Sequence, residues 1–179
     1  MRRTELMIPE KIANFVFVTD PENSQYIVRN HEFLRLVESR QRFLDRGDNT
    51  TAGYIQNDIE EFVRKYDSRY LTPGNAKVGD GATVVLYSDR YAGTIIKATP
   101  LSITVQRDTA TLDPEFKPEW ILGGFAAHCT NQEDQKYTYE RDEHGEIYTF
   151  RWSDKHQSYG RPGNLRAIKG RHEFYDYNF

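Results

Sequence analysis

Residues 78–108, which read VGDGATVVLYSDRYAGTIIKATPLSITVQRD, decide the fold. Three runs rich in β-branched and aromatic residues are separated by short turn sequences, and they cover residues 83–87, 91–97 and 103–107. Gly93 lies inside the second run, where a glycine indicates a bulge or a sharply coiled strand. Closely spaced short strands of this kind predict a small, strongly curved antiparallel β-barrel.

A further β-hairpin is predicted across residues 136–152. Aromatic and polar residues alternate on both sides of a turn that ends at Gly145, which we expect at positive φ. If Arg141 faces Glu146 across the turn, Tyr139 faces Tyr148, which places aromatic side chains opposite one another on neighbouring strands.

The remaining C-terminal sequence predicts three local features. The pair Gly123 and Gly124 indicates a bend, residues 165–168 a short strand after a turn, and residues 174–179 a final alternating strand.

The chain before residue 72 has a helical period instead. Asn30 is a predicted N-cap and Gly47 a predicted residue after the helix end, which together bound a first amphipathic helix. A second helix follows at once, so the two should form an antiparallel hairpin. Its apolar stripe comprises Ile55, Ile59, Phe62, Val63 and Tyr66. Earlier in the chain, residues 15–19 and 24–28 are predicted as short strands.

These patterns predict an α+β protein with two parts. Residues 1–76 form a mainly helical region and residues 77–179 a small antiparallel barrel. The boundary lies at residues 72–75, Thr-Pro-Gly-Asn, because Pro stops the preceding helix and Gly-Asn favours a turn.

Composition indicates an ordinary globular chain, with 28% charged and 37% hydrophobic residues. The net charge is −3, and neither side of Ala76 is strongly basic or acidic: 11 basic against 12 acidic residues before the break, and 13 against 15 after it. A single Cys excludes an intrachain disulfide framework and suits a reducing compartment. Because the first residues lack an apolar signal sequence and no run is long enough to cross a membrane, we expect a cytoplasmic location.

Several motifs carry a family resemblance over residues 77–179. Residues 79–108 resemble SH3-like (KOW-type) barrels, with a Gly-Asp entry and Gly-Thr before a coiled strand. Residues 88–94 (SDRYAGT), 105–110 (VQRDTA), 148–151 (YTFR) and 174–179 (FYDYNF) resemble uncharacterised proteins of bacteriophages and mobile elements. The resemblance implies a phage context and hence host takeover or defence inhibition in the host cytoplasm. It implies no catalytic residue.

Catalytic and metal chemistry have weak support in the sequence. Cys129 follows His128, and adjacent side chains on a strand point to opposite faces, so the two cannot form a nucleophile–base pair. A zinc site would have to combine these residues with His144, His156 or His172, without the closely spaced ligand pair that structural zinc sites show. We therefore expect no catalytic residue, no metal and no cofactor.

Charge is segregated within the second part of the chain. Residues 155–172 hold five basic residues and no acidic one, and this predicted basic edge comprises Lys155, Arg161, Arg166, Lys169 and Arg171. Residues 133–146 hold six acidic against two basic residues, and the predicted acidic hairpin comprises Glu140, Asp142 and Glu143. A basic edge beside aromatic residues can follow a phosphate backbone, and an acidic hairpin can meet a basic partner, although both can also be solvated loops.

Three functions remain open from the sequence. The first is a non-catalytic phage or mobile-element protein that binds nucleic acid or a host nucleoprotein, as an inhibitor of a host defence system. The second is a small hydrolase or nucleotide-processing enzyme, with a pocket formed by Asp89, Arg107, Asp108, Tyr148 and Arg151. The third is a protein that sequesters a small ligand in the aromatic-rich barrel.

Overall fold

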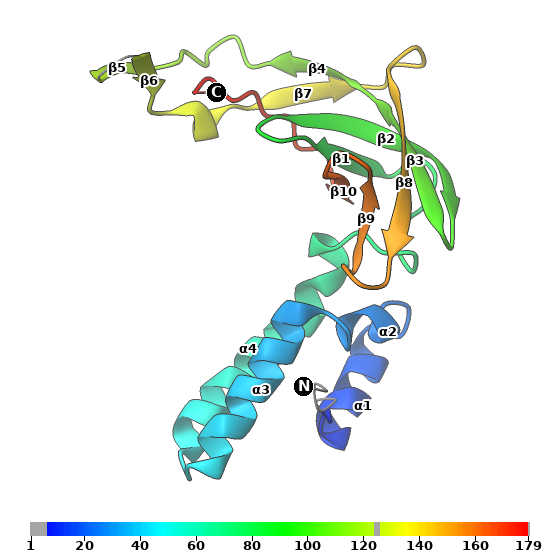
Figure 1. The fold of residues 1–179 in the computed structure, drawn as a ribbon, viewed down its shortest axis with the longest axis vertical. Coiled ribbons are helices and arrows are strands. Elements are labelled where there is room, and N and C mark those ends of the chain that lie inside the picture. The colour runs from blue at the N-terminus through cyan, green and yellow to red at the C-terminus, as the bar shows by residue number, and fades with distance from the viewer. Residues whose placement is uncertain (1–6, 124–125, 179) are drawn as a thin grey trace. The chain divides into compact units, whose positions relative to one another are not determined.

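The computed structural model describes residues 7–123 and 126–178. The chain separates into two compact units that meet in the sequence at Asn75 and Ala76. The first contains helices and the second a closed six-stranded antiparallel barrel, so the predicted α+β class is confirmed (Figure 1). In the described part of the chain, no helix has the length and apolar character needed to cross a membrane.

The helices of the first unit begin and end where local signals place them. They are α1 (Glu10–Thr19), α2 (Ser24–Ile27), α3 (His31–Asp45) and α4 (Asn49–Arg69). The Asn30 side chain accepts hydrogen bonds from the backbone N–H groups of Glu32 and Phe33 at 2.9 and 3.3 Å, which confirms the N-cap of α3. Gly47 has φ +77°, a left-handed conformation that suits glycine after a helix end.

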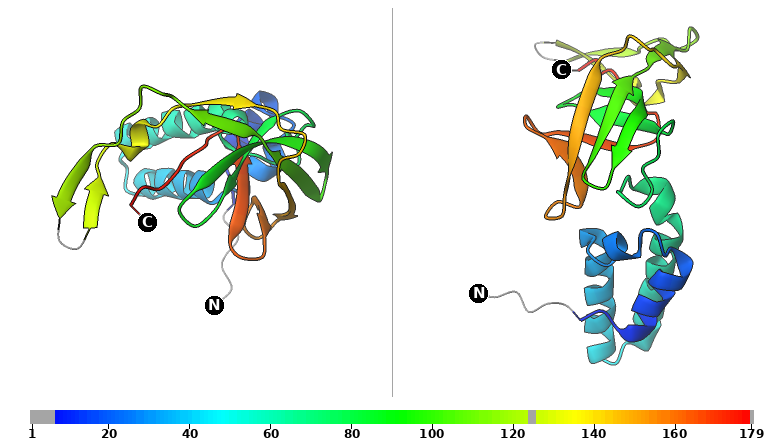
Figure 2. Two further views of the ribbon diagram at one scale, coloured as in Figure 1. Left: turned by 90° about the horizontal axis from the view of Figure 1, so that it is seen from above. Right: turned by 90° about the vertical axis from the view of Figure 1, so that its right-hand side faces the viewer.

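Helices α3 and α4 lie side by side as the predicted hairpin (Figures 1 and 2). Their shared core includes the Phe33 and Phe62 rings, whose centroids are 6.0 Å apart. Phe62 also contacts Tyr66 at 5.7 Å, one turn further along α4. The predicted apolar stripe of α4 is therefore the face that packs on α3.

Residues 15–19 and 24–28 are not strands, so that prediction is wrong. Residues 15–19 belong to α1, and residues 24–27 form α2 with Val28 as its C-cap. Ile12 and Val16, one helical turn apart, are buried on the same side of α1, and α1 contacts α4. The strand pattern of residues 15–19 misleads because four successive apolar residues fit either period.

The barrel strands follow one another antiparallel in the closed order β1-β10-β9-β8-β3-β2. Their bounds are β1 (Gly81–Val85), β2 (Arg90–Thr99), β3 (Ser102–Arg107), β8 (Ile147–Ser153), β9 (Ser158–Arg161) and β10 (Leu165–Lys169). Large side chains that fill the interior include Val84, Ile95, Ile103, Val105, Phe150 and Tyr159. The protein's own side chains therefore pack the interior of the barrel.

Two shorter two-stranded sheets belong to the same unit. Strand β4 (Thr109–Leu112) pairs with β7 (Tyr137–Glu140), and β5 (Trp120–Gly123) pairs with β6 (Ala126–Cys129). A 3₁₀ turn, η1 (Gln132–Asp134), joins β6 to β7. The expected bend at the two glycines involves Gly124, which lies outside the described residues.

The predicted pairing of Tyr139 with Tyr148 is wrong. Tyr139 on β7 faces Ala110 on β4, whereas Tyr148 on β8 faces Val105 on β3. The reason is a close approach between backbones at Gly145, where an added Cβ would lie 2.0 Å from the carbonyl oxygen of Arg107. After the turn at Gly145, β8 pairs with β3. A glycine is needed in this turn because there is no room for a Cβ, and not because the backbone has a positive φ.

Gly93 has a similar role. An added Cβ would lie 2.5 Å from the carbonyl oxygen of Gln106 on the neighbouring strand. The irregularity expected at Gly93 occurs a few residues later, between Ile95 and Lys97, where the β2–β3 register shifts. The glycine thus permits close strand contact, and the bulge bends the strand beyond it.

The C-terminal segment 174–178 is not a strand. Only an isolated antiparallel bridge between Arg90 and Phe174 is present, and Phe179 lies outside the described residues. The segment is held by side chains, because Asp89 and Gln132 accept hydrogen bonds from the backbone N–H groups of Asp176 and Tyr177. Alternation alone could not reveal that these backbone groups bond side chains and not a strand.

Replacement of Gly145 by Ala should destabilise the protein by about 1–3 kcal/mol or more, because the methyl group would collide with the Arg107 backbone. Gly53→Ala is the matched control. Gly53 lies on exposed α4 with nothing within 4 Å of an added Cβ, so Ala should stabilise by about 0.5–1 kcal/mol. Urea unfolding of both variants checks this, and equal effects would contradict the close approach.

Candidate functional site

A row of outward-facing residues crosses three neighbouring strands of the barrel. Gly160 on β9 is paired with Arg151 on β8 and with Arg166 on β10. Directly opposed residues in antiparallel strands carry their side chains on the same face. Two exposed arginines therefore stand on either side of a residue that has no side chain, and an added Cβ at Gly160 would meet only the Leu165 carbonyl oxygen, at 3.7 Å.

This arrangement forms an open groove of about 650 Å³. Its lining includes Arg151, Trp152, His156, Gly160, Arg161 and Arg166, and we call it the β9 groove. Ser158, the other outward residue of β9, also lines it, so the central strand carries only small groups on this face. With neighbouring strands about 4.8 Å apart, the β8 and β10 backbones lie about 10 Å apart across the groove.

The β9 groove is cationic. Residues 151–171 contain six Lys or Arg residues and one acidic residue, Asp154. Among residues 7–123 and 126–178, none of the ion pairs involves Arg151, Arg161 or Arg166. Their charges are therefore available to an anionic ligand.

Arg161 also covers an aromatic ring at the edge of the barrel. Its guanidinium carbon lies 5.8 Å from the Tyr148 ring centroid. Burial and a 2.7 Å hydrogen bond from the Tyr148 hydroxyl to Glu146 raise the pKa of Tyr148 to about 12. Tyr148 thus remains neutral at physiological pH and adds no negative charge near the arginine.

The five residues of the predicted basic edge have different surroundings in the structure. Arg161 and Arg166 line the β9 groove, and Lys155 is exposed in the turn that also carries His156. Lys169 is half-buried at the end of β10, opposite Ala82. Arg171 faces the carboxylate of Asp108.

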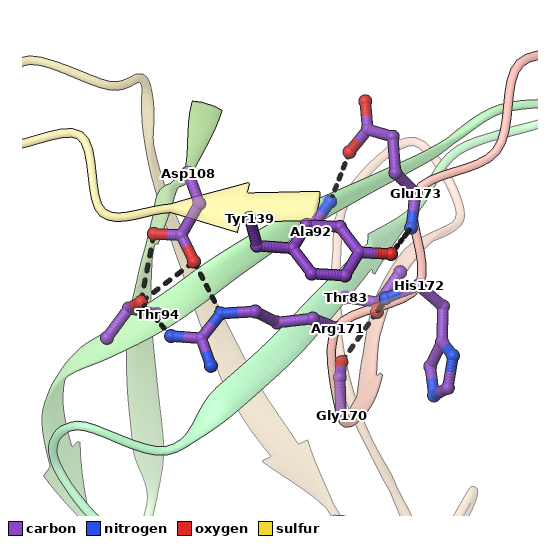
Figure 3. Close-up of polar contacts among 9 residues, drawn as sticks. All are labelled: Thr83, Ala92, Thr94, Asp108, Tyr139, Gly170, Arg171, His172 and Glu173. Atoms are coloured by element: carbon purple, nitrogen blue, oxygen red, sulfur yellow. Dashed lines mark hydrogen bonds and ion pairs between the residues drawn. The ribbon is translucent and has the colours of Figure 1, made fainter. Parts of the chain in front are cut away.

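Arg171 belongs to a polar network at one end of the barrel (Figure 3). Its Nε donates to Asp108 Oδ2 at 2.7 Å, and its Nη2 donates to Thr94 Oγ1 at the same distance. The Asp108 side chain is only 1% exposed, and both of its oxygens lie 2.9 Å from Thr94 Oγ1. A buried carboxylate requires such pairing, so the interaction is structural.

The five residues of the predicted enzymatic pocket bond to different partners, although Arg107 and Tyr148 both contact Glu146. Asp89 accepts from the Asp176 backbone, Arg107 pairs with Glu173 at 3.2 Å over the Tyr91 ring, and Asp108 pairs with Arg171. Tyr148 bonds to Glu146, and Arg151 lies in the β9 groove. Of these five side chains, Asp108 is buried and paired, whereas Arg151 is exposed.

One of the three residues of the predicted acidic hairpin stabilises a turn. Asp142 accepts a hydrogen bond from the His144 backbone N–H at 2.8 Å, which stabilises the turn. Glu140 and Glu143 are exposed. In the described part of the chain, neither carboxylate forms an ion pair.

Cys129 is 1% exposed and lies in the β5–β6 hairpin. In the part of the chain that the structure describes, no group of three His, Cys, Asp or Glu side chains is placed to hold a metal ion. The cysteine is a small buried residue at the base of this hairpin.

Sequence reasoning assigned Arg151, Arg161 and Arg166 to candidate sites but not the other residues that line the groove, among them Trp152, His156 and Gly160. Gly160 follows Tyr159 in a short run of alternating type, and a glycine inside a strand does signal close approach or open space. The glycine could therefore have indicated a groove. Its pairing with Arg151 and Arg166 depends on the register of β9 against β8 and β10, which the sequence does not give.

These features define an α+β protein whose six-stranded antiparallel barrel carries a cationic groove on its outer face. Comparisons with protein-family models, curated proteins and solved structures found no match.

Replacement of Arg171 by Met should destabilise the protein by about 3 kcal/mol, because it leaves the buried Asp108 carboxylate without its cation. Arg166→Met, on the exposed face of β10, should change the free energy of unfolding by less than about 0.5 kcal/mol. Chemical denaturation distinguishes the two. Equal costs would show that the Asp108–Arg171 pair does not hold the barrel together.

Proposed function

We propose that this protein is a non-catalytic nucleic-acid-binding protein whose β9 groove holds a phosphate backbone. The observation that supports this most directly is the placement of Arg151 and Arg166 on the two sides of Gly160, without carboxylate partners in the described part of the chain. Guanidinium groups match phosphate oxygens in charge and geometry.

The shape of the groove supports the same ligand. Because Gly160 and Ser158 leave the floor low, a phosphate chain can approach the β9 backbone while arginines reach it from both sides. His156 and Trp152 border the cavity, and aromatic rings beside a cationic groove can stack on bases. The Trp152 ring is held by an edge contact with Tyr159 at 5.2 Å.

The biological setting extends this proposal. The resemblance of residues 77–179 to SH3-like (KOW-type) phage and mobile-element proteins favours a host nucleoprotein as the carrier of the nucleic acid. In that setting the protein would inhibit a host defence system by occupying its nucleic-acid site. The exposed Glu140 and Glu143 could then meet a basic region of the same complex.

Charge reversal in the groove should abolish binding. For Arg151→Glu combined with Arg166→Glu, we expect at least a tenfold loss of affinity for short DNA and RNA oligonucleotides, measured by fluorescence anisotropy. Affinity of the wild type should fall steeply with salt, because bound phosphates release counterions. Arg141→Glu, on an exposed turn residue outside the groove, is the matched control and should bind normally. Salt-independent or absent binding by the wild type would refute the proposal.

Filling the groove without changing its charge should have a similar effect. Gly160→Phe places a ring between the two arginines, and we expect at least a tenfold weaker affinity with little loss of stability, since no close contact opposes an added Cβ. Thr149→Phe adds the same ring to the exposed face of β8 outside the groove lining and should leave binding intact. If the two variants bind equally well, the ligand does not lie over β9.

A further inference from the structure

The β5–β6 hairpin lies outside the barrel and projects from it (Figure 1 and the left view of Figure 2). Among the strands of the described residues, its two strands pair only with each other, and Trp120 lies opposite Cys129. A two-stranded hairpin alone is marginally stable in water, so the groups along its outer edges are important. The two edges of this hairpin differ in how they are covered.

The chain's own C-terminal segment covers the edge of β6. The Asn178 side chain accepts a hydrogen bond from the Cys129 N–H at 2.7 Å and donates one to the Cys129 carbonyl oxygen at 3.0 Å. A carboxamide carries the same donor and acceptor as a peptide group. Asn178 therefore occupies the place that one residue of a third strand would take.

This bond also establishes which backbone groups of β5 point outward. Since the Cys129 backbone faces Asn178, Trp120 and Cys129 form a non-hydrogen-bonded pair. In an antiparallel pair such positions alternate, so the N–H and C=O groups of Trp120 and Leu122 point away from β6. Within residues 7–123 and 126–178, no hydrogen-bond partner reaches them. Strand β5 thus presents an open edge.

The side chains on this open edge are strongly apolar. Leu122 is 90% exposed, Ile121 61% and Trp120 47%. The Trp120 ring is oriented by an edge contact with Tyr177, whose centroid lies 6.0 Å away. Natural proteins usually protect an exposed apolar edge, so an open one indicates a binding surface.

The charges next to β5 favour a particular occupant. Residues 113–119, which lead into β5, contain Asp113, Glu115 and Glu119 against Lys117. A second copy would bring the same acidic residues to the edge, where like charges repel. A cationic segment would be attracted instead.

We propose that the open edge of β5 binds an extended, lysine- or arginine-rich segment of a partner protein by strand addition. Its backbone would bond to the outward groups of Trp120 and Leu122, and its apolar side chains would cover Leu122. The β9 groove takes no part in this contact, so the inference does not rest on the proposed nucleic-acid function.

The test uses the full-length protein and three synthetic octapeptides. One alternates Val and Lys, the second alternates Val and Glu, and the third is the Val-Lys peptide with N-methyl groups on every second amide. We expect saturable binding of the first, at least tenfold weaker binding of the other two by fluorescence anisotropy, and at least tenfold slower hydrogen exchange of the Leu122 amide in the first complex. Equal binding of the methylated peptide, or of the Val-Glu peptide, or no binding of the first, would overturn the proposal.

Two variants locate the contact. Leu122→Pro removes an N–H that points away from β6, so the hairpin should persist while Val-Lys peptide binding falls at least tenfold. Arg151→Glu with Arg166→Glu should leave peptide binding unchanged, which separates this site from the groove. Analytical ultracentrifugation completes the test: dimerisation that Leu122→Pro abolishes would make a second copy the occupant and reject the cationic segment.

Discussion

The barrel depends on the buried ion pair between Asp108 and Arg171. Asp108 follows β3, Arg171 follows β10, and Thr94 on β2 joins them, so three strands are tied at one end of the barrel. Such a pair is costly to desolvate, and its value lies in the penalty for breaking it, because the buried carboxylate would then keep only the Thr94 hydroxyl and no cation. It also fixes the direction of the chain beyond β10.

From this pair the C-terminal segment is guided by successive polar contacts (Figure 3). The His172 N–H donates to Thr83 Oγ1 at 2.9 Å, and the Glu173 carboxylate accepts from the Ala92 N–H at 2.6 Å. The segment ends at Asn178, which covers the edge of β6. The ion pair therefore lies at the start of a chain of polar contacts that runs from the end of the barrel to the base of the projecting hairpin.

The same pair separates structural from available charge. Arg171 lies in the predicted basic edge, but its guanidinium is bound to Asp108, whereas Arg161 and Arg166 face an open groove. Local charge density could not distinguish them, since the partner of Arg171 lies 63 residues away. Arg151, which the sequence grouped with Asp108 in a catalytic pocket, joins the groove through strand pairing.

The sequence by itself determined the features that act within a few residues. The Asn30 cap, the Gly47 helix end and the α4 stripe depend on neighbouring backbone and side chains, and the period change after residue 75 marked the α+β division. Only the tertiary structure decided which strands pair. The Gly145 backbone lies close to that of Arg107 where β8 begins to pair with β3. The pairing of Gly160 with both Arg151 and Arg166 places the two arginines on one face of the sheet. Strand pairing joins residues far apart in the chain, and several registers satisfy the same two-residue alternation, so packing and backbone hydrogen bonds across the whole barrel select among them.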